Sequence, residues 1–155
     1  MASPLTLIMP LIPGTTLDEI IRVVAKYTPD ISKAVKNIGT VHYARVMVFD
    51  RSTPNLQPGM TPGSLSLAII TEYDGDFNAY IQDFVVALGE AFFDALLPLV
   101  VGGKALLPTI DHIPEFEKYV MINDASAHPP NSLQENNGLY EAYPYTVQTI
   151  LASCG

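Results

Sequence analysis

Two residues of one short segment have side chains that could take part in acid–base or anion chemistry, His42 and Arg45. Histidine titrates near neutrality and can act as a general acid, a general base or a ligand. The guanidinium of arginine is a planar donor that pairs with carboxylates and phosphates. Both residues are therefore candidate catalytic residues. They lie in Val41 to Arg51, a stretch rich in β-branched and aromatic residues that predicts a strand, where alternation places them on opposite faces unless a bulge intervenes.

Each of these side chains also has a structural interpretation. His42 can be an acid–base group in a pocket on a sheet face, or a hydrogen-bonded histidine that only supports the start of a strand. Arg45 can bind an anionic substrate, or it can form an ion pair with Glu72 on the neighbouring predicted strand. Tyr43 and Tyr73 are candidate substrate-binding residues, because a tyrosine ring joins an apolar body to a polar tip, although tyrosines are also common in cores and interfaces.

The familiar catalytic and metal-binding motifs are absent from the sequence. No pair of His or Cys residues has the spacing of a zinc site, and the acidic residues from Asp74 onward lack the glycine and glutamate of a calcium loop. There is no phosphate loop, dinucleotide fingerprint or nucleophile elbow. We therefore predict no metal site. The single cysteine, Cys154, cannot form an intrachain disulfide, so we expect a reducing, cytoplasmic location.

Composition restricts the partners of the protein. The length of 155 residues predicts one domain, residues 1–155. Hydrophobic residues make up 48% of the chain and charged residues only 15%, so little charge is available to cover the surface. We therefore expect apolar surface to be buried in a homo-oligomer, a dimer in the simplest case. The formal net charge of −8 disfavours nucleic acid and acidic membrane surfaces as partners. The most hydrophobic later stretch, Phe84 to Gly102, contains Glu90, Asp94 and Pro98, so we predict no membrane segment.

These residues must be positioned by a small number of elements. Strands are predicted at Leu5 to Leu11, Val41 to Arg51, Ser64 to Tyr73 and Leu139 to Tyr143, with loops at Ser52 to Gly63 and His128 to Gly138. Shorter helices are predicted at Glu115 to Asn123 and Thr146 to Ala152. A capping box, Thr16-Leu17-Asp18-Glu19, begins the first helix, and Pro29 is expected to kink or end it.

The longest predicted helix follows the acidic cap Asp74-Gly75-Asp76 and runs to about Leu97. Its other face is unusually apolar, with Val86, Phe93 and Leu97, and needs cover from the C-terminal segment or from another subunit. Its inner stripe is predicted to be Phe77, Ile81, Phe84, Leu88, Ala91, Ala95 and Leu99.

The order of these elements predicts an α+β fold of the ferredoxin-like βαββαβ plan, with an antiparallel sheet and its two main helices on one face. The other face of such a sheet is open. A second subunit, an added helix or lid, or a bound molecule is expected to cover it.

Several segments of the chain resemble bacterial ferredoxin-like domains of the dimeric α+β barrel type, which occur in proteins often labelled peroxidase-like. The matching segments fall in the same order over nearly the whole chain: Pro10 to Gly14, Gly39 to Arg45, Tyr73 to Asp76, and Tyr143 to Val147 with Ile150. The chain departs from that group at Leu99 to Gly103, where the group has a motif of the cysteine-glycine-tyrosine-proline type. Any role attached to that motif is therefore not transferred.

Two hypotheses about function follow. The first is a domain that binds a small apolar or aromatic ligand in a pocket on the open sheet face or in the cleft between two subunits. If it is an enzyme, the resemblance implies a dimeric barrel with oxidoreductase chemistry of the peroxidase or monooxygenase kind and haem as a candidate cofactor. His42, Arg45, Tyr43 and Tyr73 would then lie near the pocket. The alternative, favoured by the low charge content, is a homo-oligomeric assembly or interaction module without catalysis. The sequence leaves open whether the protein is an enzyme.

Overall fold

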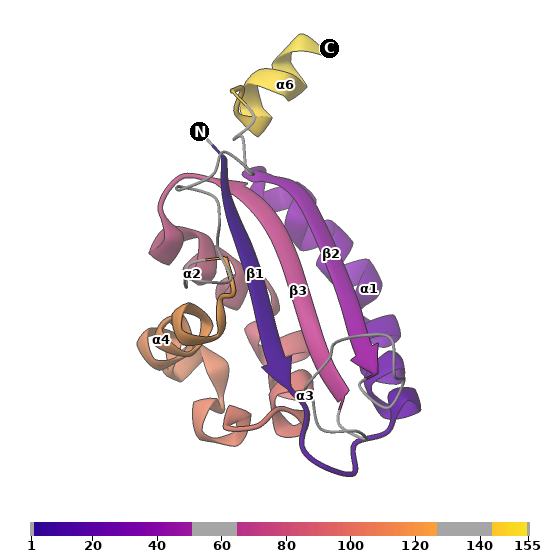
Figure 1. The fold of residues 1–155 in the computed structure, drawn as a ribbon. Helices are drawn as coiled ribbons and strands as arrows, with labels where there is room; N and C mark the ends of the chain where they lie inside the picture. The colour runs from indigo at the N-terminus through magenta and orange to yellow at the C-terminus, as the bar shows by residue number, and fades with distance from the viewer. Residues whose placement is uncertain (1, 51–64, 127–143, 155) are drawn as a thin grey trace.

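The computed structural model describes residues 2–50, 65–126 and 144–154. It has an α+β fold in which helices pack against one face of a three-stranded antiparallel sheet (Figure 1). The main elements are β1 (Ala2–Pro10), α1 (Leu17–Ile38), β2 (Val41–Asp50), β3 (Leu65–Asp74), α2 (Phe77–Leu88), α4 (Ile113–Asn123) and α6 (Val147–Ser153). The predicted strand Leu139 to Tyr143 and both predicted loops lie outside the described residues.

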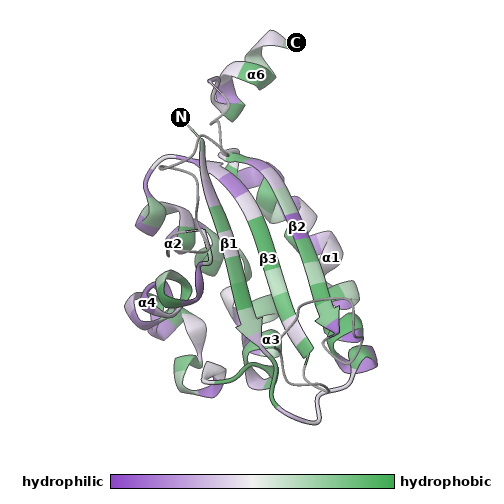
Figure 2. Ribbon diagram, in the orientation of Figure 1, coloured by the Kyte–Doolittle hydropathy of each residue, from purple (hydrophilic) through white to green (hydrophobic). Residues whose placement is uncertain are grey.

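The sheet has the strand order β1-β3-β2, and both outer strands run antiparallel to β3. Leu5 and Ala44 both pair with Thr71, so these three residues lie in one row on the side of the sheet that faces the helices. The register shifts between Val41 and Tyr43, which places a bulge at His42. Figure 2 shows apolar residues along the middle of all three strands.

Helix α1 begins where the sequence predicts it, with the Thr16 hydroxyl accepting from the Glu19 amide and the Glu19 carboxylate accepting from the Thr16 amide. Of the two outcomes predicted for Pro29, an end of the helix is wrong, because α1 continues through it to Ile38. The reason is packing: core-facing residues lie on both sides of the exposed proline, and their burial outweighs the cost of about 3 kcal/mol for an interior proline.

The long predicted helix is present, but its register changes partway along. Helix α2 begins at Phe77, and the carboxylate of Asp76 caps it by accepting from the amides of Asn78 and Ala79. A π-helical segment, η1 (Gly89–Phe93), then inserts about one extra residue per turn relative to an α-helix. The remainder consists of short segments: α3 (Asp94–Leu96), η2 (Leu97–Leu99), η3 (Gly103–Leu106) and η4 (Thr109–Asp111).

This π-helical segment overturns the predicted outer face of the helix. Phe93 and Leu97 are buried, whereas Ala91 of the predicted inner stripe is exposed. The wider π turn rotates the residues that follow Leu88, so that Phe92 and Phe93 both point into the core. Phe93 contacts Phe116 of α4 with ring centroids 5.0 Å apart, so the C-terminal part of the chain covers this face. Only Val86, with an exposed fraction of 67%, remains as predicted.

The hydrophobic core lies between the sheet and the helices. None of the helices in the described ranges has both the length and the apolar character needed to cross a bilayer. The free edge of β1 is joined to the residues that follow α4. There the Asp124 carboxylate accepts hydrogen bonds from the amides of Thr6 and Ser126, and the Ala125 amide donates to the Thr6 carbonyl.

Candidate functional site

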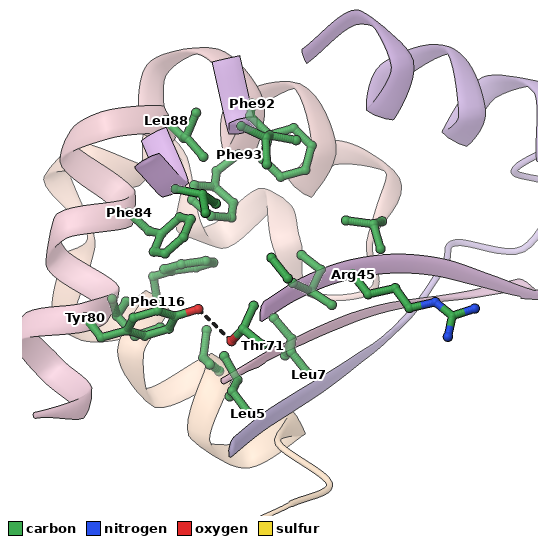
Figure 3. Close-up of a pocket in the computed structure, with 17 residues that line it drawn as sticks. Leu5, Leu7, Arg45, Thr71, Tyr80, Phe84, Leu88, Phe92, Phe93 and Phe116 are labelled. Atoms are coloured by element: carbon green, nitrogen blue, oxygen red, sulfur yellow. Dashed lines mark hydrogen bonds between the residues drawn. The ribbon is translucent and has the colours of Figure 1, made fainter. Parts of the chain in front are cut away.

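A cavity of about 60 Å³ lies between the sheet and the helices (Figure 3). The residues that line this cavity come from all three strands and from α1, α2, η1 and α4. Aromatic rings form a large part of its wall: Tyr80, Phe84, Phe92, Phe93 and Phe116. Because such a wall offers water few hydrogen-bond partners, the cavity suits an apolar group.

The cavity has a closed end and an open end. Among the lining residues that the structure describes, only Ala44 and Arg45 of β2 are exposed, whereas those from β1 and α4 are buried. Ala44 lies on the helix-facing side of β2, so its exposure shows that α1 does not seal the cavity there. The opening is therefore at the β2 edge of the sheet, beside Ile31 and Val35 of α1.

One pair of hydroxyl groups lies in the buried part of the wall. The Thr71 Oγ1 and Tyr80 Oη atoms are 2.6 Å apart, and one hydroxyl donates to the other (Figure 3). The Tyr80 ring is stacked on Tyr73 with ring centroids 4.0 Å apart. Burial raises the pKa of Tyr80 well above its ordinary value, so its hydroxyl stays neutral. The hydrogen-bonding groups that the described residues offer at this end of the cavity are therefore uncharged.

His42 lies outside the cavity lining, at the end of the sheet where β2 begins and β3 ends. Its Nε2 atom is 3.0 Å from Asp74 Oδ1, and both side chains have an exposed fraction of only 11%. An ionised carboxylate only accepts hydrogen bonds, so the proton of the pair is on Nε2. The other oxygen, Asp74 Oδ2, accepts from the Val147 amide at 2.8 Å.

This hydrogen bonding changes the acidity of Asp74. Burial alone would raise its pKa, but the hydrogen bonds from His42 and from the Val147 amide outweigh that effect and hold the pKa below its usual range. The Asp74 amide also donates to the Thr40 carbonyl. Asp74 therefore links β3 to the start of β2 and to α6, an arrangement that agrees with the structural interpretation of His42.

The structure does not bring the four predicted site residues together. Arg45 lies at the cavity opening, but its guanidinium points away from the interior (Figure 3). Tyr43 is 47% exposed and does not line the cavity. Tyr73 is buried and reaches the cavity only through its contact with Tyr80.

The predicted ion pair between Arg45 and Glu72 is absent from the described residues. The register of the two strands explains this. Glu72 pairs with Tyr43, whereas Arg45 pairs with Ile70, so the two charged side chains are not directly opposite each other. Among the described residues of the cavity wall, Arg45 is thus the one that carries a charge.

Sequence reasoning did not single out Thr71, Tyr80, Phe84 or Phe116 as site residues. A signal was present for Thr71, because it is a polar residue within an otherwise apolar alternating stripe of its strand. No comparable local signal exists for Phe116, which reaches the cavity from a helix far along the chain.

The described residues contain no cluster of three side chains suited to a metal ion. Haem does not fit the cavity either, because the site is much smaller than the roughly 300–1,000 Å³ of ordinary ligand pockets. In addition, none of the described residues that line the cavity is a histidine, cysteine or methionine that could serve as an axial ligand, and the one tyrosine among them, Tyr80, already forms a hydrogen bond with Thr71. Comparisons with protein-family models, with curated proteins and with solved structures find no match for this chain.

Proposed function

We propose that this protein binds a small, mainly apolar molecule, or the apolar end of a larger one, in the cavity between its sheet and its helices. The observation that carries the proposal is an aromatic-lined cavity that reaches the surface at Ala44. An unfilled cavity of 60 Å³ costs on the order of 1 kcal/mol. An apolar ligand that enters it restores the missing contacts.

The size of the cavity narrows the ligand. A cavity of about 150 Å³ takes up benzene, so 60 Å³ has room for about two or three carbon atoms. Of the apolar or aromatic ligands that we expect from the sequence, a short aliphatic group therefore fits better than an aromatic ring. The described residues that line the cavity support binding of such a group.

Xenon and 1-butanol test this proposal, because both are small and mainly apolar. We expect NMR titration of the full chain to shift the amides of the lining residues, and we expect Ala44→Leu to abolish the shifts by closing the opening. Ala79→Leu is the matched control, since Ala79 is also exposed but does not line the cavity. Unchanged spectra with both probes would refute the proposal.

The ferredoxin-like βαββαβ plan is also part of this proposal. In that plan the last strand pairs antiparallel with the first strand at its free edge. Leu7 of β1 already forms an antiparallel bridge with Asp124 at that edge, which supports continuation of the sheet there. A cytoplasmic location and a dimeric barrel are further parts of the same proposal.

A homo-oligomeric assembly is the second candidate, favoured by the exposed ring of Tyr43 on the sheet face that lies away from the described helices (Figure 1). Tyr43, Met47 and Phe49 of β2 lie on that face by strand alternation. Light scattering of the wild type is expected to give a dimer that Tyr43→Glu dissociates and Val86→Glu, on a helix surface, does not. A monomeric wild type would contradict this candidate.

A further inference from the structure

We infer that the ligand of the cavity is a short, uncharged aldehyde or ketone, whose carbonyl oxygen accepts a hydrogen bond from the hydroxyl pair of Thr71 and Tyr80. This inference deepens the proposed function and depends on it. The proposed function concerns the apolar part of the ligand, whereas this inference assigns its polar group.

The hydroxyl pair lies one strand inward from the opening of the cavity. Ala44 at the opening pairs with Thr71 in the sheet, and the Cβ atoms of directly opposed residues on neighbouring strands lie about 5 Å apart. The Tyr80 hydroxyl reaches the same place from α2, where it lies 2.6 Å from the Thr71 oxygen (Figure 3). Both residues line the cavity, so a small molecule that passes Ala44 comes close to both oxygens.

The pair has one hydrogen atom more than its own hydrogen bond uses. Each hydroxyl carries one hydrogen, so the two side chains bring two hydrogens to the pair. Only one of them lies between the two oxygens, whichever hydroxyl is the donor. Within the described part of the chain, neither hydroxyl forms a further hydrogen bond. The second hydrogen is therefore available to an acceptor on the ligand.

Burial makes this second hydrogen important for binding. The exposed fractions of Thr71 and Tyr80 are only 3% and 5%, so bulk water has little access to either hydroxyl. A buried donor without a partner is unfavourable, and most such groups in proteins are satisfied. A ligand oxygen beside the pair satisfies the donor while the alkyl part of the ligand fills the apolar space.

The surroundings of the pair favour a carbonyl oxygen as the acceptor. A carboxylate at this place would lose its hydration without gaining a counter-charge, because the hydrogen-bonding groups that the described residues offer there are uncharged. An alcohol would bring a further hydrogen that needs an acceptor of its own, whereas a carbonyl group brings none. With room for about two or three carbon atoms, the cavity suits a ketone of the size of acetone.

Acetone and 2-methylpropene test the inference, because they have nearly the same shape and only acetone has an acceptor. The measurement is an NMR titration of the isotope-labelled full chain with each compound. The affinity for acetone relative to 2-methylpropene should fall about tenfold in the double variant Thr71→Val/Tyr80→Phe, the loss expected when a buried carbonyl is deprived of one hydrogen bond. Tyr119→Phe is the matched control and should leave the ratio unchanged, since the Tyr119 hydroxyl donates to the Val101 carbonyl and Tyr119 does not line the cavity.

The outcomes separate this inference from the proposed function. If 2-methylpropene binds but acetone does not, or if wild type and double variant give the same ratio, the cavity binds apolar groups but the carbonyl assignment is wrong. If neither compound shifts the amides of the lining residues, both proposals fail. The double variant is expected to fold, because replacing both partners of a hydrogen bond by apolar groups of similar shape costs little, and its spectrum without ligand verifies this.

Discussion

His42 and Asp74 are 32 positions apart in the chain, yet His42 Nε2 lies 3.0 Å from Asp74 Oδ1. The contact joins the bulge at the start of β2 to the last residue of β3. The second oxygen of Asp74 accepts from the Val147 amide at the start of α6. One carboxylate therefore connects two strands and a C-terminal helix, and its state of ionisation should affect stability.

The first prediction concerns the pH dependence of that stability. The pKa of Asp74 is lowered in the folded protein, whereas an unfolded aspartate titrates near a pKa of about 3.9. Its contribution is therefore complete above about pH 4 and is lost as the pH falls through the lower pKa of the folded state. Urea unfolding between pH 7 and pH 2.5 measures this dependence.

Asp74→Asn should reduce the free energy of unfolding at pH 7 by about 1–2 kcal/mol, because it replaces a charged acceptor by a neutral one. The difference from wild type should shrink in acid. Asp83→Asn is the matched control, since Asp83 is an exposed aspartate of α2. A constant difference between wild type and Asp74→Asn across the whole pH range would count against the role assigned to Asp74.

The second prediction concerns the buried hydroxyl pair of Thr71 and Tyr80. Tyr80→Phe should cost about 1–3 kcal/mol, because it leaves the Thr71 hydroxyl buried without this partner, and Thr71→Val should have a similar cost. The double variant should be more stable than the sum of the two losses implies. Chemical denaturation of all four proteins gives the coupling energy, and strict additivity would disprove a direct interaction.

The third prediction concerns the register change at η1. Phe93 is buried against Phe92 and Phe116, so Phe93→Ala should cost about 3–5 kcal/mol and Phe93→Glu should prevent folding. Val86→Glu, on the exposed side of α2, should change stability by no more than about 0.5 kcal/mol. Circular dichroism during urea unfolding compares them, and a folded Phe93→Glu would show that the side chain does not belong to the core.

Local patterns in the sequence were sufficient for much of the fold. The capping box at Thr16, the Asp76 cap and the alternation of β2 and β3 involve residues only a few positions apart. Their physical effects act within one turn or one strand, so they can be read without the rest of the chain. For the same reason the α+β class could be predicted.

Local patterns failed where distant segments decide the outcome. Pro29 remains inside α1 because core contacts on both sides of it outweigh its local cost. The stripe predicted for the long helix is correct through Leu88 and then shifts at the π-helical segment. Gly89, the first residue of this segment, is buried. A side chain there would be crowded, because its Cβ atom would lie 3.2 Å from Val85 Cγ1.

By itself, the sequence determined which residue types could act and which short elements carry them: a histidine and an arginine on one strand, tyrosines nearby, and helices with defined starting points. Only the tertiary structure decided their grouping. Strand register separated His42 from Arg45. Packing of α1, α2 and α4 on the sheet enclosed a cavity, and of the four candidate site residues only Arg45 is among those that line it. The physical reason is that cavities and long-range hydrogen bonds depend on contacts between segments far apart in the chain, which no local pattern encodes.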